Sequence, residues 1–348
     1  MHHIAVIPGD GIGAEVTREA VKVLRHVAHQ TDFALHFEAW DLGAERYLRT
    51  GQTITDEEMR RIGEADAILL GAMGDPRVPG NQHARDILLG LRFRLDLYIN
   101  LRPVRLYDTR LSPLRDVQLD DIAMDIFREN TEGVYVGSGG NFKEGTPDEV
   151  AIQEDINTRK GVERIIRAAF EHARVHGRHV TLSDKANAMP HAGSLWRRTF
   201  TEVGAEYPDV ERHAMYADAL AMEMIRAPAR WQVIVAPNLF GDLLSDLAAG
   251  LVGGLGLAPS ASLHPGRTGL FEPVHGSAPD LVGTGKANPL AAILTAGLLL
   301  EHLGHPQDAT RVEAAVRAAV RDGATTPDLG GTLDTAQVGD GIVAALGR

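Results

Sequence analysis

Apolar and polar positions alternate along the chain in two recurring patterns, one of strand length and one of helical period. Apolar residues spaced three and four apart predict helices with one buried face, at 158–176, 289–303 and 307–322. Short, nearly continuous apolar runs predict buried strands at 4–7, 67–70, 123–127, 179–182 and 233–236. Strands that alternate with helices in this way are typical of an α/β fold with a largely parallel sheet.

The segment 131–156, rich in glycine and glutamate, departs from this alternation. Its two apolar stretches, 134–136 and 150–152, predict the strands of an exposed hairpin arm. A two-stranded hairpin cannot bury much apolar surface by itself. We therefore expect this arm to pair with a second subunit.

Length, charge and the absence of cysteine exclude several classes of protein. A chain of 348 residues is expected to form one large or two medium domains. A net charge of −12 without a basic patch argues against nucleic-acid and anionic-membrane partners. No apolar run approaches the ~20 residues that span a bilayer. The first strand begins at Ile4, which leaves no room for a signal peptide, so we expect a cytoplasmic protein. Without cysteine there are no disulfides, thiolate metal sites or cysteine nucleophiles.

A possible metal site lies in residues 238–247, NLFGDLLSDL, directly after a predicted strand. Asp242 and Asp246 stand four apart at the start of a predicted helix, which puts them on one face about 5–6 Å apart. Favourable interaction with the helix dipole would account for Asp242, but Asp246 lies among leucines. Two such carboxylates repel each other unless a cation or donors neutralise them. We therefore predict a hard divalent cation, Mg²⁺ or Mn²⁺.

Basic residues supply candidates for proton transfer and for anion binding. Only five of the 35 basic residues are lysines. Arginine does not deprotonate whereas a buried lysine can, which singles out Lys185; the alternative is an ordinary ion pair with Asp184. Arg92, Arg102 and Arg128 each lie beside apolar residues, where an unpaired guanidinium is costly. Convergence on a di- or tricarboxylate would account for all three, although coincidence among thirty arginines stays open.

Three glycine-containing loops are candidates for phosphate binding. Residues 8–13, PGDGIG, lie between a strand and a helix, where such loops cradle phosphates. Residues 71–75 follow another strand, and 271–289 form a long polar loop. None has the G-x-G-x-x-G spacing and no P-loop occurs. Tight turns also need glycine, so a dinucleotide, if bound, is held without the Rossmann fingerprint.

Six ordered motifs together resemble the β-decarboxylating dehydrogenases, whose members act on isopropylmalate, isocitrate, homoisocitrate or tartrate and D-malate. The motifs are 7–13, 100–103, 128–133, 184–187, 238–246 and 272–280. The resemblance runs from Ile4 to about Gly341. It implies an isopropylmalate dehydrogenase-like fold with two α/β domains around a central cleft. A discontinuous cofactor domain would comprise 1–99 and 252–348, and a substrate and dimerisation domain 100–251.

The resemblance also implies roles for individual residues in a homodimer with shared sites. Lys185 and Asp218 of one subunit would deprotonate the C2 hydroxyl in the other subunit's site as hydride leaves for the nicotinamide. Tyr135 would help to protonate the enol. The metal would be bound by Asp242, Asp246 and the partner's Asp218. The substrate-binding residues would be Leu88, Leu89, Arg92, Arg102 and Arg128.

The cofactor implied by the resemblance is NAD. Asp280 would accept hydrogen bonds from both adenosine-ribose hydroxyls and repel the 2′-phosphate of NADP. The implied cofactor contacts are Ile12, Gly71, Gly74, His275, Gly276, Ser277, Ala278, Asp280, Leu281 and Asn288.

Substrate choice depends on the segment 87–92, which in the family meets the C3 substituent. Homoisocitrate enzymes tend to carry an arginine near Leu89, and isocitrate enzymes a hydroxyl residue. Leu88 and Leu89 would leave a third carboxylate buried and unpaired, whereas an isopropyl group gains about 25 cal/mol per Å² buried. We expect oxidation of 3-isopropylmalate to 2-oxoisocaproate, the leucine-biosynthesis reaction. Tartrate/D-malate dehydrogenases, which can have leucines here too, are the alternative, followed by homoisocitrate dehydrogenase.

Overall fold

The computed structural model describes residues 1–347, which form two compact units. The first unit comprises Met1–Leu97, Arg105–Leu119 and Ala249–Arg348, and the second Tyr98–Val104 and Asp120–Ala248. Residues 105–119, which the sequence analysis placed in the middle domain, thus group with the first unit. Within residues 1–347, no helix is both long enough and apolar enough to cross a membrane.

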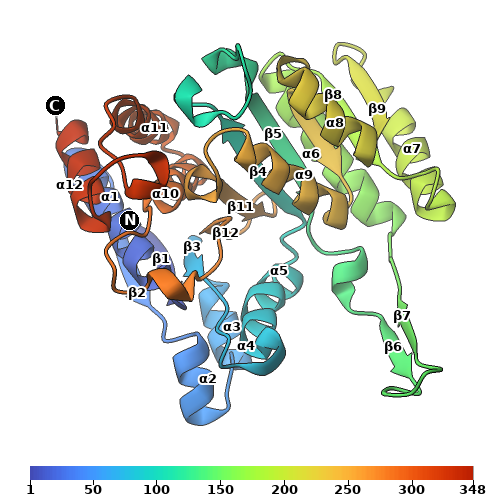
Figure 1. Ribbon diagram of the computed structural model, residues 1–348, viewed down its shortest axis with the longest axis horizontal. Coiled ribbons are helices and arrows are strands. Elements are labelled where there is room, and N and C mark those ends of the chain that lie inside the picture. Colours follow the sequence, from blue (N-terminus) through green and yellow to red (C-terminus); the bar gives the residue numbers. More distant parts are fainter. Residues whose placement is uncertain (348) are drawn as a thin grey trace. The chain divides into compact units, whose positions relative to one another are not determined.

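The first unit contains a sheet whose strands run in the order β2-β1-β3-β12-β11. The strands are β1 (His2–Gly9), β2 (Leu35–Ala39), β3 (Ala67–Ala72), β11 (Pro259–Leu263) and β12 (Gly269–Pro273). Neighbours from β2 to β12 are parallel, and only β11 runs antiparallel to β12. The helices, shown in Figure 1, are α1 (Gly13–Gln30), α2 (Ala44–Thr50), α3 (Asp56–Ile62), α4 (Gln82–Ala84), α5 (Gly90–Arg94), α10 (Leu290–His302), α11 (Pro306–Arg321) and α12 (Thr335–Leu346).

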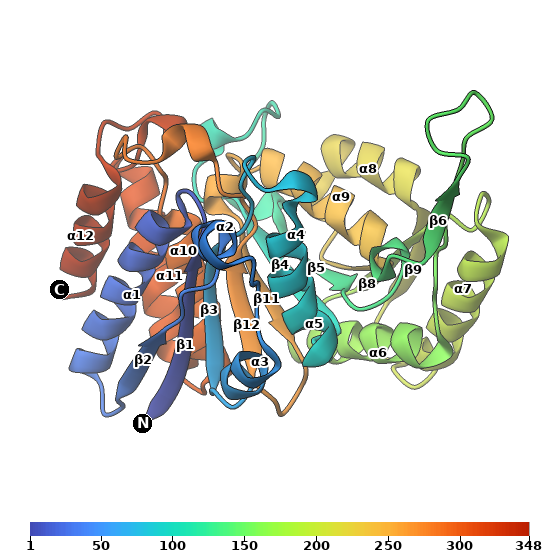
Figure 2. The same cartoon turned by 90° about the horizontal axis from the view of Figure 1, so that it is seen from below.

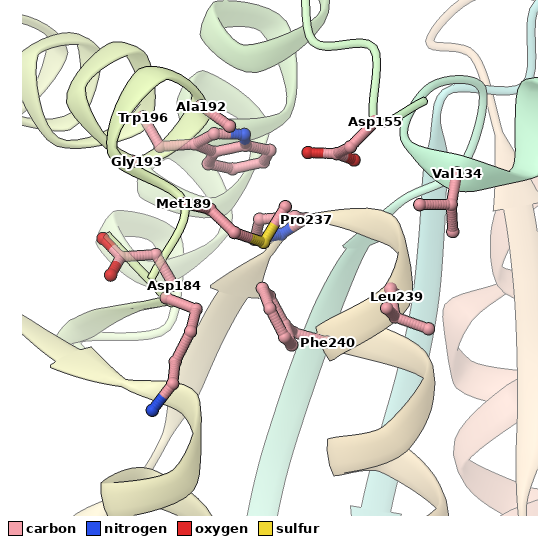
Figure 3. A pocket seen from close by; sticks show the side chains of 11 residues that line it. Val134, Asp155, Asp184, Met189, Ala192, Gly193, Trp196, Pro237, Leu239 and Phe240 are labelled. Carbon is pink, nitrogen blue, oxygen red and sulfur yellow. The ribbon is translucent and has the colours of Figure 1, made fainter. Parts of the chain in front are cut away.

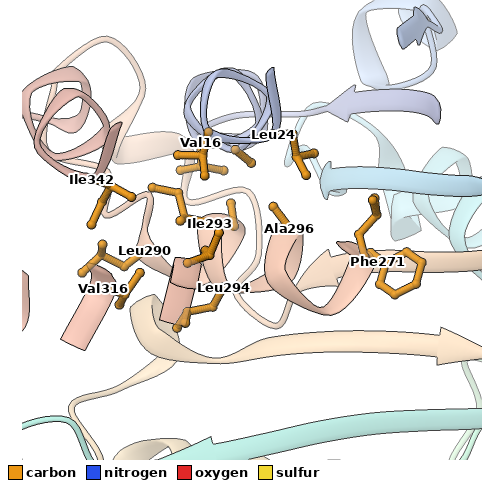
Figure 4. Packing of buried hydrophobic residues seen from close by; sticks show 14 of the residues in the cluster. Val16, Leu24, Phe271, Leu290, Ile293, Leu294, Ala296, Val316 and Ile342 are labelled. Atoms are coloured by element: carbon orange, nitrogen blue, oxygen red, sulfur yellow. The ribbon is translucent and has the colours of Figure 1, made fainter. Parts of the chain in front are cut away.

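The core of the first unit is built around α10, which is buried on nearly every side. Helix α10 packs against α1, α11 and the strands β11 and β12. Figure 4 shows Ile293 and Leu294 of α10 among side chains of neighbouring helices such as Val16 and Val316. Each fully buried side chain of this size contributes about 1.5–3 kcal/mol, and this cluster holds the sheet and its loops in place.

An ion pair near α3 gives the first unit an acid-sensitive contact. The Glu58 carboxylate accepts a hydrogen bond from Arg46 Nη1 at 2.6 Å and one from the Thr55 backbone N–H at 2.8 Å. The Arg46 guanidinium lowers the pKa of Glu58 from 4.5 to about 2, against the effect of burial. A carboxylate with a depressed pKa contributes stability that is lost as pH falls from about 4.5 through about 2. Glu58→Gln should therefore lower the melting temperature at pH 7, and this difference should shrink below about pH 4.5 and vanish only below about pH 2, as measured by thermal unfolding.

The second unit contains a sheet with the strand order β4-β5-β10-β8-β9. The strands are β4 (Ile99–Arg105), β5 (Ala123–Glu129), β8 (Val180–Asp184), β9 (Arg212–Tyr216) and β10 (Val233–Ala236). The pairs β5–β10, β10–β8 and β8–β9 are parallel. The helices are α6 (Arg159–Val175), α7 (Pro190–Gly204), α8 (Ala217–Arg226) and α9 (Asn238–Gly250), whose last two residues belong to the first unit. The parallel pairing confirms the predicted α/β fold class.

The predicted hairpin exists, but one of its strands was placed wrongly. The strands are β6 (Gly139–Phe142) and β7 (Val150–Gln153), which pair antiparallel and project from the rest of their unit (Figure 2). Residues Val134–Val136 form a 3₁₀ turn instead of a strand. Glycines with positive φ stand on both sides of this turn, Gly133 at 80° and Gly137 at 74°, and they bend the chain where a strand would continue.

Candidate active site

Strand order in the second unit brings Arg128 and the start of α9 together. Strand β10 pairs with β5 in a register that sets Ala236 opposite Arg128. Helix α9 begins two residues later, so its first turn lies at the same edge of the sheet as Arg128. Gly241 permits the approach, because a Cβ there would lie 2.7 Å from Arg128 Cβ. The carboxyl ends of parallel strands are where ligands bind in open α/β sheets.

Asp242 is the centre of a charged cluster at this edge. Its Oδ1 accepts from Arg128 Nη1 at 2.5 Å and lies 3.2 Å from Arg102 Nη2. Its Oδ2 accepts from the Tyr135 hydroxyl at 2.7 Å. Arg102 Nη1 also lies 3.3 Å from Asp246 Oδ1. The structure thus brings together five of the residues singled out in the sequence, from β4, β5, the 3₁₀ turn and α9.

Two groups of this cluster have shifted pKa values. Burial, with the hydrogen bond to Asp242 next, raises the pKa of Tyr135, so the phenol remains protonated and able to donate. Partial burial raises the pKa of Asp246; the Asp242 carboxylate adds to this and Arg102 opposes it. Burial and the neighbouring Asp242 carboxylate both disfavour the charged form of Asp246.

The cluster supplies two acidic ligands and no more. Among residues 1–347 no group of three or more acidic or histidine side chains is arranged to hold a metal ion. Asp218, the third predicted ligand, does not form such a group with Asp242 and Asp246 within the described residues, and it pairs with Lys185. A cation at Asp242 and Asp246 would need its remaining ligands from water, substrate or another chain.

Lys185 and Asp218 meet because β8 and β9 are neighbouring parallel strands. Asp184 and Tyr216 are in register at the ends of these strands, so the residues that follow emerge side by side. Lys185 Nζ lies 2.5 Å from Asp218 Oδ1, and this amine lowers the pKa of Asp218. The alternative ion pair between Lys185 and Asp184 is wrong, since Asp184 Oδ2 accepts from Arg197 Nε at 2.7 Å.

Lys185 also borders a pocket in the second unit (Figure 3). The pocket encloses about 380 Å³, including its open mouth. Met189 and Trp196 from the segment after Lys185 face Phe240 of α9, and Asp155 adds a carboxylate. Its lining is mainly apolar, which suits a hydrophobic group more than an ion.

Three residues that the sequence analysis did not single out hold the arginines in place. Arg102 Nε donates to Asn100 Oδ1 at 2.8 Å, and its Nη1 donates to Ser245 Oγ at 2.7 Å. Arg128 Nε donates to Asn238 Oδ1 at 2.9 Å. The spacing contained the signal: Asn100 and Arg102 share one face of a strand, and Ser245 follows Asp242 by three residues on a helix.

The other substrate-binding candidates lie in the first unit. Leu88 and Leu89 are half-buried and belong to a π-helical turn, Arg85–Leu89, just before α5. Arg92 in α5 is almost fully buried, and its Nη2 donates to Glu272 Oε1 at 2.7 Å. Glu272 lies on β12 and therefore fixes the Arg92 guanidinium against the sheet.

The predicted cofactor residues all lie in the first unit, where two of their loops touch. The Ile12 backbone N–H donates to the Ser277 carbonyl at 2.8 Å. Burial lowers the pKa of His275, and its Nε2 has no hydrogen-bond partner within the described residues. Asp280 is exposed beside Leu281. An orphaned ring nitrogen and an exposed carboxylate fit a polar ligand such as a nucleotide.

Two of these cofactor candidates are explained by packing. A Cβ on Gly71 would lie 2.3 Å from the Pro8 carbonyl oxygen, so only glycine fits there. The Asn288 side chain accepts from the N–H of Leu290, the first residue of α10, and donates to Asp328, both at 2.9 Å. Neither residue needs a cofactor to account for its presence.

The fold and the cluster define an α/β protein with two arginines, able to bind an anion, beside paired carboxylates. A family model described as "Isocitrate/isopropylmalate dehydrogenase" matches residues 3–342, and the chain belongs to this family. It is thus an oxidoreductase that couples oxidation to decarboxylation, in a family that generally uses NAD and a divalent metal.

Known relatives match over nearly the whole chain. A 3-isopropylmalate dehydrogenase of Rhodococcus jostii is 49% identical over 345 residues, 99% of each chain. One of Beutenbergia cavernae is 47% identical over 346 residues, 99% of this chain and 98% of that one. Among solved structures, an isocitrate dehydrogenase from Methylococcus capsulatus is 38% identical with a TM-score of 0.91, covering 100% of both chains.

Proposed function

We propose that this protein oxidises and decarboxylates 3-isopropylmalate to 2-oxoisocaproate, the leucine-biosynthesis step, with NAD as hydride acceptor. The observation that carries the reaction class is the cluster of Arg102, Arg128 and Tyr135 on Asp242 beside Asp246. The choice of isopropylmalate rests on the apolar pair Leu88 and Leu89 and on the relatives at 47–49% identity.

The chain's residues divide the work on a malate between anion binding and proton transfer. Arg102 and Arg128 hold carboxylate oxygens through paired hydrogen bonds, and we assign the same role to Arg92. Lys185, held by Asp218, takes the proton of the C2 hydroxyl. Tyr135, kept protonated by its raised pKa, then donates a proton to the enol carbon.

Asp242 and Asp246 fit a divalent cation, because their carboxylates lie close enough for Arg102 to contact both, with Nη2 3.2 Å from Asp242 Oδ1 and Nη1 3.3 Å from Asp246 Oδ1. We propose that they hold Mg²⁺ or Mn²⁺ together with Asp218 of the partner subunit. When bound, the cation supplies Lewis-acid stabilisation of the enolate that follows loss of CO₂. Ile12, His275 and Asp280 would hold NAD, which would supply the hydride acceptor.

Cofactor preference provides one prediction. Asp280 would repel a 2′-phosphate and accept the ribose hydroxyls, so NAD⁺ should exceed NADP⁺ in kcat/KM by at least about tenfold. Asp280→Asn should narrow this ratio mainly through the KM of NAD⁺, and Asp32→Asn, at an exposed aspartate of the first unit, should leave the ratio unchanged. A preference for NADP⁺ in the unaltered enzyme would contradict the assignment.

Substrate preference provides a second prediction. Leu89→Arg places a cation where a third carboxylate would lie, and it should shift kcat/KM from isopropylmalate toward homoisocitrate by about tenfold or more. Leu48→Arg, at an exposed leucine of α2, is the matched control. If Leu89→Arg leaves the ratio unchanged, Leu89 does not face the substituent.

We further propose a homodimer with shared sites. Exposed apolar side chains gather on the hairpin, at Phe142, Val150 and Ile152. Others lie on α8 and α9, at Met222, Ile225, Leu239 and Leu243. Such exposure is typical of surfaces that a second subunit covers. Sedimentation as a monomer at micromolar concentration would contradict this arrangement.

The deciding experiment measures NADH formation with NAD⁺ and Mn²⁺, comparing (2R,3S)-3-isopropylmalate with D-malate. A kcat/KM at least about tenfold higher for isopropylmalate supports the proposal. Equal or better use of D-malate or tartrate would favour the alternative function, tartrate/D-malate dehydrogenase. A preference for homoisocitrate would instead indicate that the region near Leu89 accepts the third carboxylate of that substrate.

A further inference from the structure

A buried histidine and aspartate in the first unit form a contact that the proposed chemistry does not use. His83 is 0% exposed, and its Nε2 lies 2.7 Å from Asp10 Oδ2. Asp10 belongs to the glycine loop 8–13, and His83 belongs to the short helix α4. The two residues are 73 positions apart in sequence, so only the fold brings them together.

The Asp10 carboxylate gathers donors from three separate segments. Its Oδ1 accepts from the backbone N–H of Ala44, at the start of α2, at 2.6 Å. Its Oδ2 accepts from the backbone N–H of Gly74 at 2.8 Å and from His83. Gly43 makes room, because a Cβ there would lie 2.6 Å from Asp10 Oδ1. Because an ionised carboxylate can only accept hydrogen bonds, the His83 ring is the donor in this contact.

Packing alone does not explain a histidine at this place. Within the described residues, His83 Nδ1 is buried and has no hydrogen-bond partner. Burying a polar atom without a partner has a free-energy cost, which an apolar side chain would avoid. The gain that offsets this cost is the donated hydrogen bond to Asp10.

His83 also lies in the first turn of the helical segment that carries the substrate-binding candidates. Helix α4, the π-helical turn Arg85–Leu89 and α5 follow one another without a break, since the residues at both junctions, Ala84 and Leu89, have helical backbone angles. A shift of His83 is therefore transmitted to Leu89 and Arg92. π-Helical turns are frequent at functional sites.

We propose that His83 is a positioning residue: through Asp10 it ties the helical segment 82–94 to the glycine loop 8–13. This inference rests on the proposed function, in which Leu89 meets the C3 substituent and Ile12 meets the cofactor. Loss of the tether loosens both elements together. It leaves the carboxylate cluster at Asp242, which belongs to the second unit, unchanged.

The test compares His83→Leu, which removes the donor, with His83→Gln, whose amide can restore it. His83→Leu should lower the ratio of kcat/KM for isopropylmalate over D-malate by about fivefold or more and raise the KM for NAD⁺. The half-saturating Mn²⁺ concentration should stay within about twofold of the unaltered enzyme. His83→Gln should recover most of both losses. His302→Leu, at a partly buried histidine of the same unit, controls for general loosening.

Hydrogen–deuterium exchange supplies a readout that needs no substrate. His83→Leu should speed exchange at amides of both 8–13 and 85–89, whereas His302→Leu should not. If His83→Leu does not fold, His83→Asn, whose amide is too short to reach Asp10, replaces it. An unchanged substrate ratio and unchanged exchange in a folded variant would overturn the proposal. If the unaltered enzyme shows no preference for isopropylmalate, the proposed function fails, while the exchange result still decides the tether.

Discussion

Lys185→Met is expected to lower the rate of NADH formation by about 10²- to 10⁴-fold, the range that general acid–base catalysis contributes. The reason is that methionine has no group to accept the C2 hydroxyl proton. Because Lys185 lies on a loop and is partly exposed, the fold should be retained. Single-turnover NADH formation, together with thermal unfolding of the same variant, measures both effects.

Lys185→Arg separates proton transfer from charge. Arginine keeps the ion pair with Asp218 but does not deprotonate, so this variant should be nearly as slow as Lys185→Met. Lys160→Met, at an exposed lysine of α6, is the matched control and should retain full activity. An active Lys185→Arg enzyme would show that the residue contributes only its charge.

The second large effect is expected from Asp246→Asn. Removing one of two anionic ligands should raise the half-saturating Mn²⁺ concentration by about tenfold or more and lower turnover with it. Asp246 is substituted rather than Asp242, because a change at Asp242 would also alter its hydrogen bonds from Tyr135 and Arg128. Asp209→Asn, at an exposed aspartate of the same unit, should change neither quantity. Unaltered Mn²⁺ dependence of Asp246→Asn would place the metal elsewhere.

Mixing the two inactive variants tests whether subunits share sites. In a heterodimer of Lys185→Met and Asp246→Asn chains, one site would hold both defects and the other neither. Random pairing in equal amounts should then restore about one quarter of the unaltered activity. No recovery after verified subunit exchange would mean that Lys185 and Asp246 serve the same site from one chain.

The Lys185–Asp218 ion pair limits how the two subunits could share their sites. The two residues are held together within one chain, by adjacent strands of one sheet. If they serve a partner's site, they do so as a preformed unit whose geometry does not depend on dimerisation. The contact that dimerisation adds would be the third metal ligand, since residues 1–347 of one chain bring no third acidic or histidine ligand to Asp242 and Asp246.

Much of the architecture could be predicted from local pattern. The strand 233–236 and the helices 158–176, 289–303 and 307–322 match the structure within about two residues, because apolar period and strand length report burial directly. The hairpin strand at 134–136 was misplaced because β-branched residues favoured a strand. Two glycines with positive φ, invisible as such in the sequence, turn the chain there.

The residues of the site could be predicted from the sequence, but the contacts between them could not. Composition and spacing singled out Asp242, Asp246 and Lys185, since rare residue types and like charges on one helix face need a chemical reason. The strand order decides which side chains contact each other. Because β8 lies next to β9, Lys185 contacts Asp218, and because β5 lies next to β10, Arg128 contacts Asp242. The Asp10–His83 contact had no local signal at all. Hydrogen bonds act over about 3 Å, and only the tertiary fold brings residues so distant in sequence within that range.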